Sequence, residues 1–161
     1  MSIFIDIVDK IKSGLSQSHN LSDVKFIDLN ITDVVPNPIE NVYVSIGFCN
    51  IEIKSGAFNS YIGMGNDGER YGNNAEIELE MKIVSPRENN AGNCYKVFAK
   101  IYEELLYNEN NYNVKTVSCG KAKYDSDIFS FELVCKIKLN AFVGYETEDI
   151  NISRIEVEKK A

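Results

Sequence analysis

The sequence is poor in the residues that build catalytic and metal centres. His19 is its only histidine, and no cysteine or second histidine stands at metal-ligand spacing from it. A histidine-based triad and a multi-histidine metal site are therefore excluded within one chain. The glycines of residues 63–68 have the spacing of a nucleotide-binding loop, but they follow no buried strand, open no amphipathic helix and lack the lysine of a P-loop. Asp33 and Asp67 lack the further ligands of a calcium loop. We expect no catalytic residue, metal or cofactor, and interpret the protein as a non-enzyme.

Paired cysteines are also missing. Cys49, Cys94, Cys119 and Cys135 show no C-x-x-C spacing, and each falls inside an expected strand or helix. We interpret them as small buried residues of a protein in a reducing compartment.

An excess of basic charge and a long apolar run are missing as well. Lysine and arginine number 17 against 24 acidic residues, and the net charge of −7 disfavours binding to nucleic acid phosphates. No apolar run approaches the roughly 18 residues of a membrane span. Residues 1–12 carry Asp6 and Asp9 and lack a basic leader followed by an apolar core, so we expect no signal peptide.

The chain does contain well-patterned strands and helices. Its 161 residues fit one domain that buries about 70% of the surface exposed by the unfolded chain. Residues 75–84 alternate apolar and charged side chains, as a half-buried strand does. Residues 94–107 carry an apolar stripe at helical spacing, with Asn89 or Asn90 as a possible helix cap.

The remaining elements complete an α+β order. We expect an N-terminal helix with its apolar positions at Phe4, Ile7, Val8, Ile11 and Leu15. Further strands are expected at residues 24–31, 41–54, 114–124 and 128–143, with an extended turn at Pro36 and Pro38. The inward parity of residues 41–54 changes near Cys49, which indicates a bulge there or burial on both faces. The prediction is one domain with a mixed or antiparallel sheet of about four to five strands, covered by the N-terminal helix and a second helix at about 93–107.

Charge patterning predicts how two strands pair. In residues 128–143 the apolar set Phe129, Phe131, Leu133, Cys135, Ile137 and Leu139 should face inward, and Ser130, Glu132, Lys136 and Lys138 outward. Lys136 and Lys138 would lie across from Glu76, Glu78 or Glu80 if this strand pairs with residues 75–84, at about 0.2–1 kcal/mol per pair. The glutamate row is a solvated face or, alternatively, the lining of a channel that repels a polyanion.

Residues 55–74 form the longest expected loop, far longer than the usual connection of about 4–6 residues. The loop mixes glycines with apolar side chains, which suits a segment that becomes ordered on a partner. Candidate contact residues are Phe58, Tyr61, Met64, Arg70 and Tyr71. The alternative is a surface hairpin that lies on its own domain.

Residues 149–159 embed Ile150, Ile152, Ile155 and Val157 among charges. This segment could add a strand to a neighbouring copy or pair with its own sheet.

In the order and length of its elements the chain resembles the tail terminator (tail completion) proteins of tailed bacteriophages and of phage-tail-like bacteriocins. The resemblance rests on Glu76-Ile77-Glu78-Leu79-Glu80-Met81 through Asn90-Ala91-Gly92-Asn93, the helix Tyr95–Leu106, and Ser118-Cys119-Gly120-Lys121-Ala122-Lys123-Tyr124 leading into Phe129-Ser130-Phe131-Glu132-Leu133. It covers most of residues 1–145 and leaves residues 146–161 as an extension beyond the compact core of that family.

The resemblance implies a structural virion-assembly protein. Such a protein forms a hexameric ring, docks on the last ring of a completed tail tube, halts polymerisation and presents a surface to the neck or head. Its expected partners are copies of itself, the tube protein, and sheath or neck proteins, with DNA only as a passing cargo and no membrane. Glu76, Glu78 and Glu80 would then face the lumen. The expected location is the cytoplasm of the bacterial host during assembly of the phage, prophage or bacteriocin, and the finished tail afterwards.

Two other classes of function stay open. A tail tube or head-to-tail connector subunit would polymerise alone into open-ended tubes instead of stopping at one ring. A small-molecule-binding domain, or an enzyme using a carboxylate pair, would show a ligand-dependent thermal shift and a monomeric mass.

Overall fold

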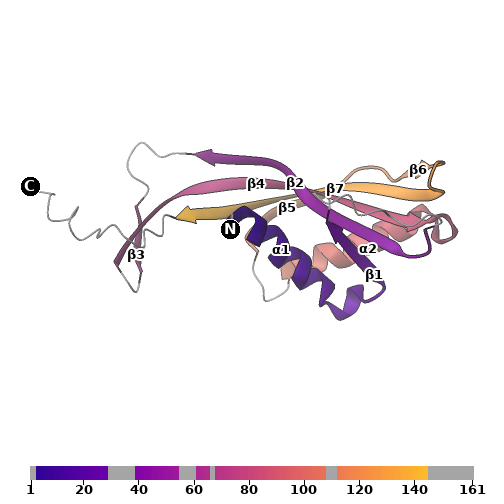
Figure 1. Cartoon of the computed structure of the whole chain (residues 1–161), viewed down its shortest axis with the longest axis horizontal. Coiled ribbons are helices and arrows are strands. Elements are labelled where there is room, and N and C mark those ends of the chain that lie inside the picture. The colour runs from indigo at the N-terminus through magenta and orange to yellow at the C-terminus, as the bar shows by residue number, and fades with distance from the viewer. Residues whose placement is uncertain (1–2, 29–38, 55–60, 66–67, 108–111, 145–161) are drawn as a thin grey trace, which may run out of the picture.

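The computed structural model describes residues 3–28, 39–54, 61–65, 68–107 and 112–144, which form one mixed sheet with two α-helices on one side (Figure 1). The helices are α1 (Ile3–Ser16) and α2 (Asn90–Tyr107), with short 3-10 turns at His19–Leu21 and Arg87–Asn89. The strands are β1 (Val24–Asp28), β2 (Val42–Lys54), β3 (Tyr61–Gly65), β4 (Gly68–Pro86), β5 (Val114–Cys119), β6 (Lys123–Asp125) and β7 (Ser130–Gly144). The α+β prediction is confirmed.

The sheet has the order β1-β2-β4-β7-β5, with β3 paired to β4 and β6 paired to β7. Only β1 and β2 run parallel, so the sheet is mixed. The five strands in this order, β1, β2, β4, β7 and β5, match the expected number of about four to five. The two short strands β3 and β6 are additional. The register of β2 against β4 shifts between Phe48 and Asn50, which confirms the bulge expected near Cys49.

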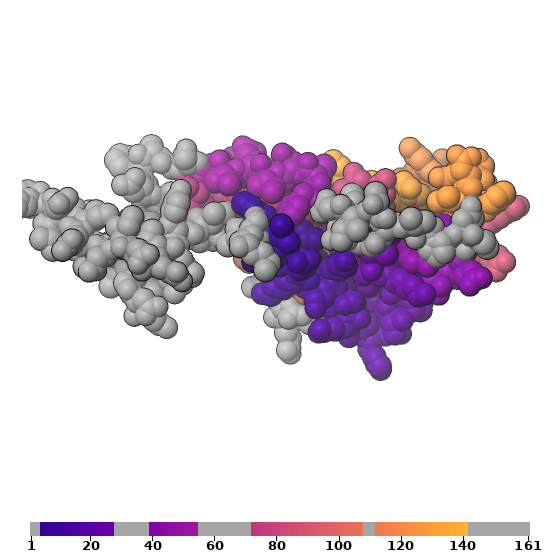
Figure 2. All heavy atoms as spheres, in the orientation of Figure 1, coloured from indigo at the N-terminus to yellow at the C-terminus, as the bar shows by residue number. Residues whose placement is uncertain are grey.

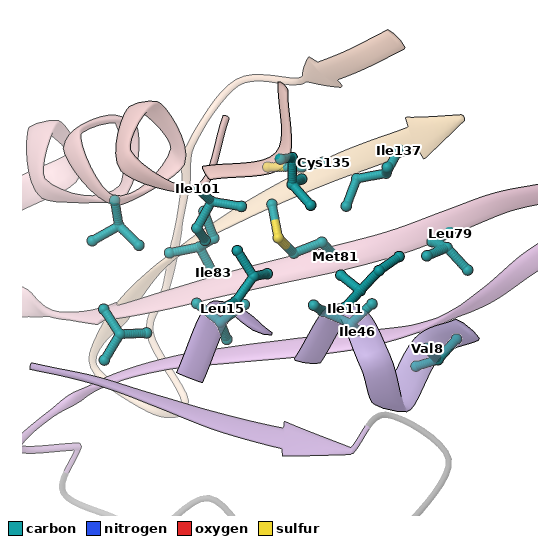
Figure 3. Packing of buried hydrophobic residues seen from close by; sticks show 14 of the residues in the cluster. Val8, Ile11, Leu15, Ile46, Leu79, Met81, Ile83, Ile101, Cys135 and Ile137 are labelled. Atoms are coloured by element: carbon teal, nitrogen blue, oxygen red, sulfur yellow. The ribbon is translucent and has the colours of Figure 1, made fainter. Parts of the chain in front are cut away.

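The core lies between the helices and one face of the sheet. α1 buries Val8, Ile11 and Leu15, and α2 buries Cys94, Val97, Ile101 and Leu105, which is the stripe that helical periodicity predicts. In Figure 3, Ile11, Leu15 and Ile101 lie with Met81 and Ile83 of β4 and with Cys135 and Ile137 of β7. α2 begins at Asn90, whose side-chain oxygen accepts a hydrogen bond from the backbone N–H of Gly92 at 2.8 Å.

Three sequence expectations need correction. The expected loop at 55–74 contains strand β3 and the first part of β4, because Tyr61–Gly65 pairs antiparallel with residues 68–71. The expected strand at 114–124 is two strands, β5 and β6. Phe129 is 59% exposed instead of inward because its φ of 50° places it in the turn before β7, and Ser130, expected outward, is fully buried.

Other expectations are met in part. β1 covers residues 24–28 of the strand expected at 24–31, and residues 29–31 and the turn expected at Pro36 and Pro38 lie outside the described residues. Cys94 and Cys135 are buried as expected, Cys119 is half-buried, and Cys49 is exposed. Cys49 is exposed because it stands at the bulge of β2.

Candidate assembly surface

The sheet face opposite the helices is lined by charged and polar side chains. Because alternate residues of a strand point to opposite faces, each buried residue of β4 and β7 is followed by one on this open face. The open face carries Glu52, Glu76, Glu78, Glu80 and Glu132 together with Lys54, Lys82, Lys115, Lys136 and Lys138. Glutamates and lysines are therefore interleaved on this face.

Glu78 is the centre of the ion pairs on this face. The register places it opposite Lys138, with Glu80 opposite Lys136, which confirms the predicted pairing of these strands by opposite charge. Lys136 Nζ donates to Glu78 Oε1 at 2.7 Å, and Lys138 Nζ lies 3.3 Å from Oε2. The hydrogen bond from Lys136 lowers the pKa of Glu78, and the same bond raises the pKa of Lys136.

Glu76 joins three strands through a second group of ion pairs. Lys115 Nζ of β5 donates to its Oε1 at 3.1 Å, and Lys54 Nζ of β2 lies 3.8 Å from its Oε2. The hydrogen bond from Lys115 lowers the pKa of Glu76. The glutamates that the sequence suggested as an acidic lining are therefore interleaved with lysines, and the face presents alternating charges instead of an acidic stripe.

A shallow hollow of about 200 Å³ lies among these side chains. It is lined by Glu52, Glu76, Glu78, Lys115, Lys138 and Asn140, among others. Small-molecule sites enclose about 300–1,000 Å³ and are predominantly apolar. This hollow is smaller than such a site, and charged side chains surround it.

One end of the sheet extends beyond the helices (Figure 1). β4 has 19 residues, which at about 3.3 Å per residue span roughly 60 Å. α2 has 18 residues and spans only about 27 Å at about 1.5 Å per residue. The far ends of β2 and β7 accompany β4 past the helices, and Figure 2 shows the atoms of β2 reaching beyond those of α1. We call residues 50–54, 61–65, 68–74 and 141–144 the arm.

The arm holds most of the contact residues that the sequence predicted. Tyr61 and Met64 lie in β3, and Arg70 and Tyr71 lie in the facing part of β4. The register places Tyr61 opposite Tyr71 and Gly65 opposite Gly68, so residues 61–65 and 68–71 pair as antiparallel strands. The structure therefore brings these four residues together, while Phe58 lies outside the described residues.

Sequence reasoning missed one feature of the arm, the outer edge of β2. β1 pairs with Val42–Ile46 only, and within the described ranges no strand pairs with the outer edge of Gly47–Lys54. Ile51 and Ile53 on this stretch are 37% and 48% exposed. Their alternation with charges indicated inward positions, but the helices end before they reach this part of the strand. The change of parity at the bulge was the only sequence signal.

Other site classes find no support in the described part of the chain. No group of three or more histidine, cysteine, aspartate or glutamate side chains there could hold a metal ion, and none of its helices is long and apolar enough to cross a membrane. His19 lies exposed in the first 3-10 turn. Comparisons with protein-family models and with curated protein sequences find no significant match to this chain.

Proposed function

We propose that this protein is a structural assembly protein of a phage tail or a phage-like tail, where it forms a hexameric ring that caps the tail tube. The ring stops polymerisation of the tube and joins it to the neck or head. The proposal combines the resemblance of the sequence to tail terminator proteins with the arm of the sheet, which is the observation that carries it.

The arm supports assembly because a ribbon of strands without a helix layer buries little apolar surface. Two-stranded ribbons are marginal in water, and long strands usually find a partner to cover them. A stable contact between subunits needs about 1,200–2,000 Å² of buried surface. The arm supplies an elongated surface at one end of the domain, which suits a contact with a neighbouring copy or with the tube.

The open sheet face is suited to line the channel of such a ring. In this arrangement the helices face outward, and Glu76, Glu78 and Glu80 with their lysine partners line the channel. Lys115, Lys136 and Lys138 each form an ion pair with a glutamate, which reduces their attraction for the phosphates of DNA. DNA passes as a cargo that does not adhere.

The proposed partners and places follow from the same role. The ring contacts copies of the same chain, the tube protein, and sheath or neck proteins. It assembles in the cytoplasm of a bacterial host and remains in the virion or bacteriocin tail.

The test is electron microscopy of the purified protein alone and with purified tail tubes. We expect closed rings of one size, and tubes that stop growing when the rings are added. Open-ended tubes formed by the protein alone would identify a tube or connector subunit instead. A strictly monomeric protein whose melting temperature rises with a small ligand would overturn the proposal.

The arm can be tested without disturbing the core. Lys54 of β2 pairs with Asn74 of β4, so replacing residues 55–73 by Asn-Gly joins the two strands with a two-residue turn of the type that hairpins favour. We expect a folded protein that no longer caps tubes. Tyr107→Ala, which removes a 74% exposed aromatic side chain on α2, is the control and should cap normally. If the shortened protein caps tubes normally, the hairpin takes no part in the proposed contact.

A further inference from the structure

Within the described residues, the outer edge of β2 has a stretch without a partner strand. Ile46 is the last residue of β2 paired with the described part of β1, and no described strand pairs with this edge of residues 47–54. Backbone N–H and C=O groups along such an edge are a template for main-chain hydrogen bonding.

The edge carries only part of the protection that exposed strands usually have. Edges are commonly short, carry lysine or proline, or turn away through a bulge. β5 at the opposite side of the sheet has six residues, a register shift and Lys115. The β2 edge is longer, contains no proline, and has one lysine, Lys54, at its end. It also presents Ile51 and Ile53 with 37% and 48% of their surface exposed. Its bulge lies at the near end and leaves residues 50–54 regularly paired to β4.

We propose that this edge binds residues 152–157 of a second copy of the chain as an added parallel strand. The inference deepens the proposed function and rests on it in one respect, since it takes the partner to be another copy. The contact is heterologous, with one surface on each copy, and repeating it around an axis closes a ring when the rotation between neighbouring copies divides a full turn.

We call residues 152–157 the donor segment, and its charged and apolar residues complement those of β2. When Ile155 is aligned in parallel with Ile53, Arg154 stands beside Glu52 and Glu156 beside Lys54. This register joins two pairs of opposite charge and one apolar pair. The antiparallel alignment that keeps Arg154 at Glu52 places Lys54 opposite Ile152 and loses the second ion pair.

The direction of the chain favours a second copy over the same copy. β2 and β7 both run antiparallel to β4, so both strands head toward the tip of the arm. A chain that continues from Gly144 must reverse its direction twice to lie parallel to its own β2. Both reversals would have to fit within residues 145–151, where Asp149 and Asn151 are the typical turn residues. A neighbouring copy can present the segment to β2 without either reversal.

Mixing two defective variants tests the contact in the full-length chain. Ile53→Lys places a charge on the acceptor edge, and Ile155→Lys places one on the donor segment. We expect each variant alone to be monomeric by light scattering and an equimolar mixture to form a heterodimer, because the mixture retains one intact acceptor and one intact donor. Ile5→Lys changes a 50% exposed isoleucine of α1 and should assemble as the unaltered protein does.

A disulfide test separates the two possible origins of the donor. In a background with Cys49→Ser and Cys119→Ser, Lys54→Cys and Glu156→Cys are combined in one chain and treated with oxidised glutathione. Burial raises the pKa of Cys94 to about 11 and that of Cys135 to about 12, so these thiols stay protonated and unreactive at neutral pH. We expect a ladder of linked copies on a non-reducing gel. An internally linked monomer, or no disulfide bond at all, would overturn the proposal.

Failure of this inference can be told apart from failure of the proposed function. If the unaltered protein forms rings and caps tubes but the variant mixture stays monomeric, the strand contact is wrong and the capping role stands. If the mixture forms heterodimers but rings of unaltered protein do not stop tube growth, the contact stands and the capping role is wrong.

Discussion

Replacing Ile101 by alanine should destabilise the monomer strongly, because this side chain joins α2 to the sheet. Ile101 is fully buried and lies with Met81, Ile83 and Cys135 in the core (Figure 3). The change removes three carbon groups at about 0.8 kcal/mol each, or roughly 2.4 kcal/mol of transfer free energy. The cavity left behind adds to this loss, and buried substitutions of this kind cost about 2–5 kcal/mol in total. Against a usual domain stability of about 5–15 kcal/mol, this is a large fraction.

Ile53→Ala is the matched control, because it makes the same chemical change on the exposed edge of β2. About half of the Ile53 side chain is already in water, with 48% exposed, and its removal leaves no enclosed cavity. We expect a loss of about 1 kcal/mol or less in the free energy of unfolding.

The assay is urea denaturation followed by far-ultraviolet circular dichroism. Both changes are made in the Ile155→Lys background, so that self-association adds nothing to the measured stability. The midpoint should fall with an unchanged slope, since neither variant alters the surface exposed on unfolding greatly. Equal losses for Ile101→Ala and Ile53→Ala would refute the assignment of one residue to the core and the other to a free edge.

Three further predictions concern individual side chains. Ser130→Ala should leave the free energy of unfolding unchanged or raise it by up to about 1 kcal/mol in the same urea assay, because the buried Ser130 hydroxyl has no hydrogen-bond partner within the described structure. The lowered pKa of Glu78 stabilises the fold above its ordinary value of 4.5, and this contribution disappears as the pH falls through the lower folded-state pKa. Glu78→Gln should therefore make the free energy of unfolding depend less on pH in the acidic range. The same pH dependence in the variant and the unaltered protein would contradict the ion pairs of Glu78. A thiol reagent at pH 8 should modify Cys49 in the native protein and reach Cys94 and Cys135 only after unfolding, which mass spectrometry of the labelled peptides can check.

The centre of the sheet could be predicted from the sequence because several local signals agree there. Apolar and charged residues alternate in 75–83 and, except at Val134, in 131–139, which fixes the side chains that face the core. A shift of one residue would bury charges. The glutamates of β4 and the lysines of β7 attract each other, which predicts the register of the two strands. The bulge near Cys49 followed from the change of parity in β2.

The arm could not be predicted in the same way. Residues 61–72 are rich in glycine, which has low strand propensity, and their pairing comes from main-chain hydrogen bonds that any sequence can make. The exposure of Ile51 and Ile53 depends on where the helix layer ends, and no local pattern records that position. The misplaced Phe129 has a similar cause, because a positive φ at a non-glycine residue is set by the turn around it.

The central ladder between β4 and β7 also sets the order in which the chain can fold. Its bond between Glu78 and Lys136 joins residues 58 positions apart, whereas the β3–β4 hairpin closes across two residues. Closing a long loop carries an entropic cost that local pairs avoid, and folding slows as the mean sequence separation of native contacts rises. During synthesis β2, β3 and β4 can associate as soon as they leave the ribosome. The second edge of β4 has no partner until β7, the last strand of the sheet, has been made. We expect folding to be limited by the arrival of β7, and newly made chains to depend on chaperones until it docks.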